Sequence, residues 1–140
     1  MIKLHIGLKG SGKTKKLIDA VNVAAGAEKG NVVCITEGNR LMHDIERGVR
    51  MVNTENFDIM NFDVFTGLLY GIIAQDFDVT HIFIDSLFKS VPKEKTENVD
   101  ALLEILEDLE KKFNVSFTVM ISVSEDDATE KMKAYIAWRF

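Results

Sequence analysis

Residues 2–14 set the fold of this chain, and they read Ile-Lys-Leu-His-Ile-Gly-Leu-Lys-Gly-Ser-Gly-Lys-Thr. Apolar and polar residues alternate over Ile2–Ile6, which predicts a β-strand, and the glycine cluster that follows predicts a tight loop. Apolar residues then recur at helical spacing over Leu17–Ala25, until Gly26 breaks the pattern. The predicted order is therefore strand, loop, helix.

The loop matches the pattern GxxxxGK[ST] without a mismatch. Its glycines allow successive backbone N–H groups to converge on phosphate oxygens, and the N-terminal end of the following helix adds positive charge. We expect Lys13 to neutralise the β- and γ-phosphates of a nucleoside triphosphate, and the Thr14 hydroxyl to bind the Mg²⁺ that bridges them. The expected ligands are ATP or ADP with Mg²⁺. The expected binding residues are Gly7, Lys9, Gly10, Ser11, Gly12, Lys13 and Thr14.

Two simpler interpretations of this loop stay open at this point. The segment can be a glycine-rich turn with an incidental lysine, although a chance match in a chain of this length has a probability on the order of 0.5%. Lys9 can be a solvated loop lysine rather than a source of positive potential for a ligand.

A second chemical element follows the apolar strand predicted at Val79–Ile84, which ends in Asp85. Ligands of open α/β sheets bind outside the carboxyl ends of the strands, and the glycine-rich loop is predicted at that same edge. We therefore expect Asp85 to support Mg²⁺ directly or through water. The alternative is an aspartate that caps a strand end.

Six strands separated mostly by helices favour an α/β fold, a three-layer αβα sandwich around a mainly parallel central sheet. The length of 140 residues fits a single domain over residues 1–140. The four further strands are predicted at Val32–Thr36, Phe57–Met60, Val115–Val123 and Lys133–Phe140. Further helices are predicted within Arg40–Arg50, around Phe65–Ile73 and over Leu102–Phe113. The last of these is expected to turn Leu102, Leu103, Ile105, Leu106, Leu109 and Phe113 inward.

Composition excludes several classes of protein. The 22 acidic residues outnumber 17 Lys and Arg, for a net charge of −5, which disfavours binding to a nucleic-acid backbone. Cys34 is the single cysteine, so an internal disulfide and a CxxC metal site are absent. No window approaches the ~20 apolar residues of a membrane span, and the N-terminal residues lack a signal-peptide pattern. We expect a cytoplasmic protein.

These elements resemble the Walker A and Walker B motifs of the P-loop NTPases, and the chain is similar to a minimal core of the RecA-type ATPases. Asp85 is followed by Ser86 and then by Leu87 and Phe88, as in the Asp-Ser Walker B of that family. Glu37 ends the second strand, where RecA-type enzymes carry a water-activating glutamate. The segment 135–139 resembles a late strand of the same core.

The resemblance implies an arrangement and a mechanism. The strand that ends in Asp85 would neighbour the strand before the loop, and the second strand would lie further out. Glu37 would orient a water for attack on the γ-phosphate and, with Lys13, would form the catalytic pair, although Glu37 can also be a polar strand terminus. Ser122 and Ser124 are candidates for sensing the γ-phosphate.

Three functions are compatible with these motifs. The leading hypothesis is a slow Mg²⁺-dependent ATPase that couples its nucleotide state to an unknown protein partner or to a homo-oligomer. The alternative is an interaction module that binds nucleotide without turnover. A small-molecule kinase is a third possibility, against which stand the single cysteine and the scattered arginines. None of the four arginines can be assigned as an arginine finger: Arg40, Arg47, Arg50 and Arg139.

Overall fold

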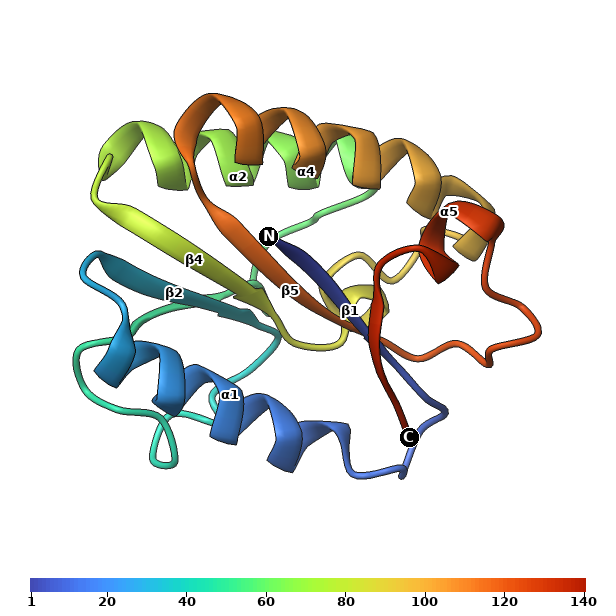
Figure 1. Ribbon diagram of the computed structural model, residues 1–140, viewed down its shortest axis with the longest axis horizontal. Helices are drawn as coiled ribbons and strands as arrows, with labels where there is room; N and C mark the ends of the chain where they lie inside the picture. The colour runs from blue at the N-terminus through green and yellow to red at the C-terminus, as the bar shows by residue number, and fades with distance from the viewer.

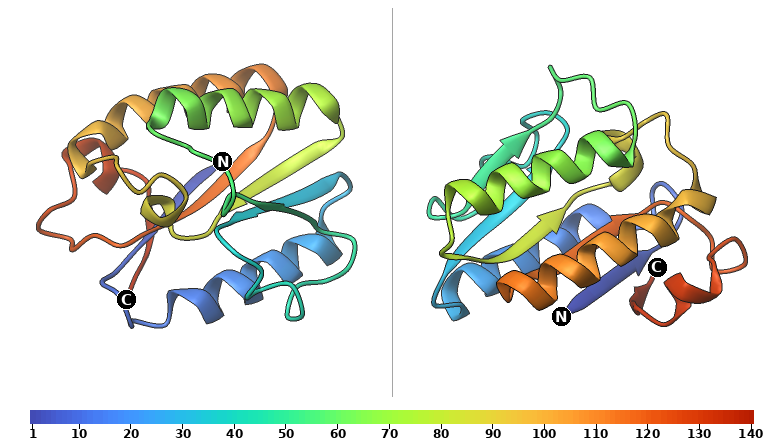
Figure 2. Two further views of the ribbon diagram at one scale, coloured as in Figure 1. Left: turned by 180° about the vertical axis from the view of Figure 1, so that it is seen from behind. Right: turned by 90° about the horizontal axis from the view of Figure 1, so that it is seen from above.

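The computed structural model describes residues 1–140 and has three layers, with a sheet between two layers of helices (Figure 1). The strands are β1 (Ile2–Ile6), β2 (Asn31–Thr36), β3 (Arg50–Asn53), β4 (Val79–Ile84), β5 (Ser116–Ile121) and β6 (Ile136–Arg139). The helices are α1 (Lys13–Ala27), α2 (Phe62–Gln75), α3 (Leu87–Ser90), α4 (Val99–Phe113) and α5 (Glu130–Lys133), with a 3-10 turn η1 (Thr96–Asn98). Helix α1 covers one face of the sheet, and α2 and α4 cover the other (Figures 1 and 2). The predicted αβα sandwich is confirmed.

All neighbouring strands in the sheet are parallel, in the order β3-β2-β4-β5-β1-β6. The second strand does lie further out, but the expected contact between β4 and β1 is wrong, because β5 lies between them. Parallel strands are joined by crossovers long enough to skip a position in the sheet, so chain order does not fix which strands are neighbours. The carboxyl ends of β1, β4 and β5 consequently meet at one edge.

The sheet has an unequal core on its two faces. A cluster of 27 buried hydrophobic residues lies on the side of α2 and α4, and a cluster of 10 lies on the side of α1. Helix α4 turns Leu102, Leu103, Leu106 and Leu109 inward as predicted. Phe113 was expected inward but is 39% exposed. It is the last residue of α4, next to Asn114, whose φ of 55° ends the helix.

The helix expected within Arg40–Arg50 is wrong, because residues 37–49 form turns and bends. Three buried apolar side chains in this segment have the spacing of a helix: Leu41, Ile45 and Val49. They pack on the α1 side of the sheet from separate turns. Asn22 of α1 holds the turns in place, since its side chain donates to Asp44 O and accepts from Glu46 N, both at 2.9 Å.

Two predicted strands also need correction. The strand expected at Phe57–Met60 is wrong, and the strand beside β2, at one edge of the sheet, is β3 instead. With four half-buried or exposed residues, β3 has no apolar run that a sequence pattern could detect. The strand expected at Lys133–Phe140 is shorter, because residues 130–133 form α5, where Thr129 Oγ1 accepts from Met132 N at 3.1 Å.

Glycines inside α2 offer a test of the fold. A Cβ added at Gly67 or Gly71 meets no atom within 4 Å, whereas at Gly30 it would lie 2.2 Å from Thr80 Cγ2 and 2.3 Å from Asp78 O. We predict that Gly67→Ala and Gly71→Ala each raise the free energy of unfolding by about 0.5–1 kcal/mol, because alanine loses less backbone entropy in a helix. Gly30→Ala should lower it. Urea unfolding followed by circular dichroism measures all three, and a destabilised Gly67→Ala would contradict the assignment of α2.

Candidate functional site

The glycine-rich loop (residues 7–12) joins β1 to α1 at the carboxyl edge of the sheet, and Lys13 and Thr14 are the first residues of α1. Gly10 and Gly12 have φ values of 84° and 92°, in the left-handed region that other residues rarely adopt. Gly12 is the N-cap of α1, so the unpaired N–H groups of the first helical turn belong to this loop and to the residues just after it. This conformation suits an anion, because the positive end of the helix adds to the backbone donors.

Gly7 is required because a side chain at this position would not fit, and not because of its backbone angles. A Cβ at this position would lie 2.7 Å from the Cβ of Phe140 and 2.8 Å from Ser11 Oγ. Phe140 is held there by its own backbone, since its N–H donates to Ile6 O at 3.0 Å. The start of the loop is therefore packed closely against the residue that follows β6.

Lys13 is buried, and its ammonium is bound by the loop itself. Nζ donates to Gly7 O at 2.8 Å, to Leu8 O at 2.6 Å and to Ser11 Oγ at 3.1 Å. Burial lowers the pKa of Lys13, the charge of Lys89 lowers it further, and Asp85 opposes both effects. The loop thus holds a positive charge at its centre, and an incoming phosphate would replace some of these carbonyl contacts.

A cavity of about 120 Å³ opens beside the loop and has no hydrophobic residue in its lining. Its lining residues are Lys9, Gly10, Gly12, Lys13, Thr14, Ser86, Lys89 and Ser122. Three lysines and no carboxylate line this space, so it attracts anions. Lys89 was not predicted, because α3 is a single short turn whose position depends on the fold. Ser122 lines the cavity, whereas Ser124 lies at a different one, next to Gly7 and Phe140.

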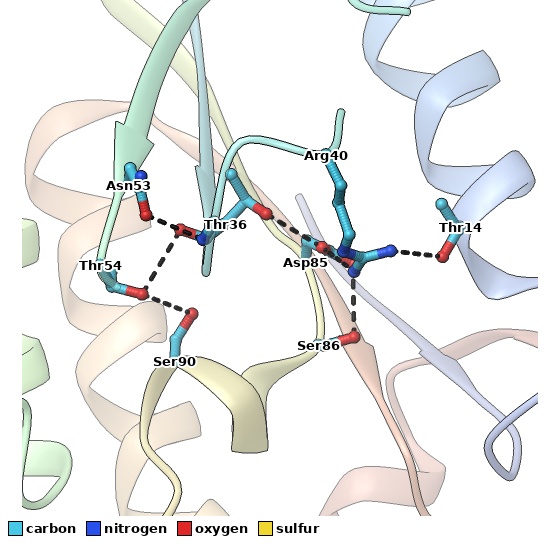
Figure 3. A network of polar contacts seen from close by, with 9 residues as sticks. Thr14, Thr36, Arg40, Asn53, Thr54, Asp85, Ser86 and Ser90 are labelled. Carbon is cyan, nitrogen blue, oxygen red and sulfur yellow. Dashed lines mark hydrogen bonds and ion pairs between the residues drawn. The ribbon is translucent and has the colours of Figure 1, made fainter. Parts of the chain in front are cut away.

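Asp85 lies directly after β4, with a side chain that is only 3% exposed. Its Oδ2 accepts a hydrogen bond from Thr36 Oγ1 at 3.1 Å and from Arg40 Nη2 at 2.7 Å, while Ser86 Oγ donates to Oδ1 at 3.4 Å (Figure 3). A buried carboxylate is tolerated only when such partners compensate its charge. Asp85 is thus held in a fixed position at the carboxyl edge of the sheet.

Arg40 joins the two residues that the sequence assigns to Mg²⁺. Its Nη2 contacts Asp85, and its Nη1 donates to Thr14 Oγ1 at 3.3 Å (Figure 3). The Thr14 hydroxyl, on α1, and the Asp85 carboxylate, directly after β4, therefore lie within reach of one cationic group, although β5 separates β4 from β1, the strand that precedes α1. No sequence pattern indicates this role, because Arg40 lies among turns for which the apolar spacing predicts a helix.

Glu37 follows β2 and is half-buried, but it is not among the residues that line the lysine-rich cavity. Its carboxylate makes no hydrogen bond or ion pair within the chain. The structure therefore brings Lys13, Thr14 and Asp85 together and leaves Glu37 beside them, one strand beyond β4.

Ser86 adopts a strained backbone conformation at the edge of the same cavity. Its φ of 48° and ψ of 76° lie in the left-handed region, which costs about 1 kcal/mol or more for a residue other than glycine. This conformation turns the chain sharply from β4 into α3 and brings Lys89 to the cavity. Strain of this kind often occurs at functional sites.

Other candidate features have structural roles. Cys34 is buried, and burial raises the pKa of its thiol to about 12, with Asp85 adding to the effect, so the cysteine acts as a small apolar residue. No group of three or more His, Cys, Asp or Glu side chains is placed to hold a metal ion. None of the helices combines the length and the apolar character that crossing a membrane would need.

A scan against models of known protein families and a search of curated proteins found no match to this chain.

His5, on the strand that leads into the loop, predicts how stability depends on pH. Its side chain is buried with Nδ1 unpartnered, and burial, with Lys16 and Lys3, lowers its pKa to about 4. The unfolded chain, with a histidine pKa near 6.5, binds the proton more readily between these two values. The free energy of unfolding should therefore fall by about 1–3 kcal/mol as the pH drops from 6.5 toward 4, and this contribution should be constant above pH 6.5.

Urea unfolding at a series of pH values measures this effect, with His5→Gln as the comparison. The variant should lose part of the slope between pH 6.5 and 4. Equal slopes in the two proteins would show that His5 does not titrate as its burial requires.

Proposed function

We propose that this chain is a nucleotide-binding protein of the P-loop NTPase superfamily, similar to a RecA-type core, that binds ATP or ADP with Mg²⁺ and hydrolyses ATP slowly. One observation carries the proposal: the Arg40 guanidinium contacts both Thr14 Oγ1 and Asp85 Oδ2, beside a cavity lined by three lysines. A place for a cation and a place for an anion are thus adjacent at one edge of the sheet.

The residues present fit a magnesium nucleotide. The donors of the loop and the ammonium of Lys13 would bind the phosphates, with Lys9 and Lys89 adding positive potential. Thr14 and Asp85 would hold Mg²⁺, which usually takes one or two protein oxygens together with phosphate oxygens and water. When bound, the ion would neutralise charge on the terminal phosphates. A volume of about 120 Å³ suits phosphate groups, so the base and ribose would extend beyond this cavity.

Hydrolysis is assigned to Glu37, which would orient the attacking water. Its position after β2, on the same edge of the sheet as Asp85, supports this role, and its carboxylate is free of partners within the chain. Rapid phosphoryl transfer usually needs an added arginine, worth about 10³–10⁵ in rate, so turnover by the isolated chain should be slow. A change of nucleotide would then be signalled to a protein partner or to a second copy of the chain.

A second candidate function is a module that binds nucleotide without turnover and presents a surface that depends on the nucleotide. The observation that favours it is the absence of Glu37 from the lining of the cavity. Ser86 also stands where many ATPases carry a second acidic residue after the Walker B aspartate. Both candidates share the binding site and differ only in the chemistry of Glu37.

Binding is tested by isothermal titration calorimetry with ATP or ADP in millimolar Mg²⁺. We predict that wild-type protein binds and that Lys13→Ala weakens binding about 10–100-fold, because a charged hydrogen-bond donor to phosphate is lost. Lys15→Ala is the matched control, since Lys15 is exposed on the first turn of α1 and lines no part of the cavity. Absence of binding by the wild-type protein would overturn the proposed function.

Hydrolysis is tested with Glu37→Gln, which keeps the size of the side chain and removes its charge. If the chain is an ATPase, we predict that phosphate release falls at least about tenfold, as expected for loss of a general base, while nucleotide affinity changes little. A wild-type protein that binds ATP and releases no phosphate would favour the non-hydrolysing module. A variant that hydrolyses as fast as wild type would exclude Glu37 as the catalytic residue.

A further inference from the structure

The backbone around Arg40 is fixed independently of its side chain. Gly38 N donates to Asn53 Oδ1 at 2.8 Å, and Asn53 Nδ2 donates to Asn39 Oδ1 at 3.0 Å. On the other side of Arg40, Leu41 is fully buried in the core under α1. The Arg40 side chain itself is 39% exposed. Its guanidinium can therefore leave Asp85 by rotation of the side chain, without movement of the chain that carries it.

The guanidinium contacts two oxygens that a metal ion would use, Asp85 Oδ2 and Thr14 Oγ1. Oδ2 of Asp85 accepts from both Thr36 and Arg40, so its accepting positions are filled. Mg²⁺ binds oxygen at about 2.0–2.1 Å and demands near-octahedral geometry, which a guanidinium nitrogen 2.7 Å from the same oxygen obstructs. The Asp85 carboxylate carries one negative charge, which balances one positive charge. A divalent cation bound beside Arg40 would therefore leave excess positive charge next to Thr14.

We propose that Arg40 is a tethered cation that competes with Mg²⁺ for Asp85 and Thr14, so that magnesium nucleotide enters only when the Arg40 side chain leaves these oxygens. The inference rests on the proposed function, because it concerns regulation of the same site. It makes Arg40 a positioning residue: the guanidinium neutralises Asp85 when no metal ion does so. Nucleotide without metal would then face a compensated carboxylate rather than a bare negative charge.

This competition predicts that removing Arg40 changes the affinity for a metal ion and the affinity for metal-free nucleotide in opposite directions. Without Arg40, a metal ion would have no competitor at Asp85, so its affinity should rise. Phosphates without metal would meet the uncompensated charge of Asp85, so their affinity should fall. A role in which Arg40 only stabilises the fold would change neither affinity, and a role in which it binds phosphate would weaken magnesium nucleotide.

The metal is tested alone first, with Mn²⁺ as a paramagnetic substitute for Mg²⁺ and electron paramagnetic resonance to count the free ion. We expect Arg40→Ala to bind Mn²⁺ about two- to fivefold more tightly than wild type, the range for loss of one partly exposed ion pair. Arg47→Ala is the matched control, because Arg47 is an exposed arginine of the same segment that makes no ion pair, and its affinity should change less than about twofold. Equal or weaker Mn²⁺ binding by Arg40→Ala would overturn the proposal.

Two further variants keep the test valid if Arg40→Ala is poorly folded by circular dichroism. Arg40→Gln removes the charge but keeps most of the length, and it should also bind Mn²⁺ more tightly. Arg40→Lys keeps the charge but lacks the planar fork that contacts two oxygens at once. It should lie between wild type and Arg40→Gln, whereas a purely structural role predicts the same Mn²⁺ affinity for all the folded variants.

The nucleotide arm separates the two proposals. ATP affinity is measured by calorimetry in Mg²⁺ and in EDTA. The affinity in Mg²⁺ divided by the affinity in EDTA should be larger for Arg40→Ala than for wild type and for Arg47→Ala. If no protein binds ATP but Arg40→Ala still binds Mn²⁺ more tightly, the proposed function fails and the competition stands. If ATP binds and neither the ratio nor the Mn²⁺ affinity changes, the competition fails and the proposed function stands.

Discussion

The buried negative charge of Asp85 is the constraint on which the geometry of this site depends. Burying an ion costs several kcal/mol of hydration free energy, and only hydrogen bonds and ion pairs with close partners can compensate this loss. Thr36 at the end of β2 and Arg40 in the following turns supply these partners at 3.1 and 2.7 Å. One carboxylate thereby ties β4 to β2 and binds a side chain of the turns after β2, whose backbone Asn22 and Asn53 also hold in place.

The hydrogen bonds around Asp85 extend to the edge of the sheet (Figure 3). Thr36 O accepts from Thr54 N at 2.9 Å, and the Thr54 hydroxyl lies 3.5 Å from Ser90 of α3. Thr54 also lines an apolar cavity of about 410 Å³ between β3 and α2, which is larger than the lysine-rich cavity but holds no cluster of charged groups. Chemistry rather than volume therefore identifies the candidate site, and the larger cavity lies at the far end of the same set of contacts.

Local patterns in the sequence were enough to predict where the glycine-rich loop and α4 lie and that Asp85 follows a strand, because each depends on residues close together in the chain. The same reasoning wrongly predicted a helix around Leu41, where the chain forms turns. Their apolar spacing is helical, but the side chain of Asn22 on α1 provides backbone partners that a helix would otherwise supply. Arg40 and Lys89 were missed for a related reason, since their places depend on turns and on the strained Ser86, which no periodic pattern encodes. Contacts between distant segments set these positions.

Strand order explains why an anion site and a buried carboxylate can coexist at this edge. Neighbouring strands lie about 4.8 Å apart, so β1 and β4, with β5 between them, are separated by roughly 10 Å. With β5 between them, the neutral Ser122 lies at the cavity and Asp85 stays out of its lining. Thr14, in the first turn of α1, and Asp85, directly after β4, make no direct hydrogen bond with each other, and the long side chain of Arg40 contacts both.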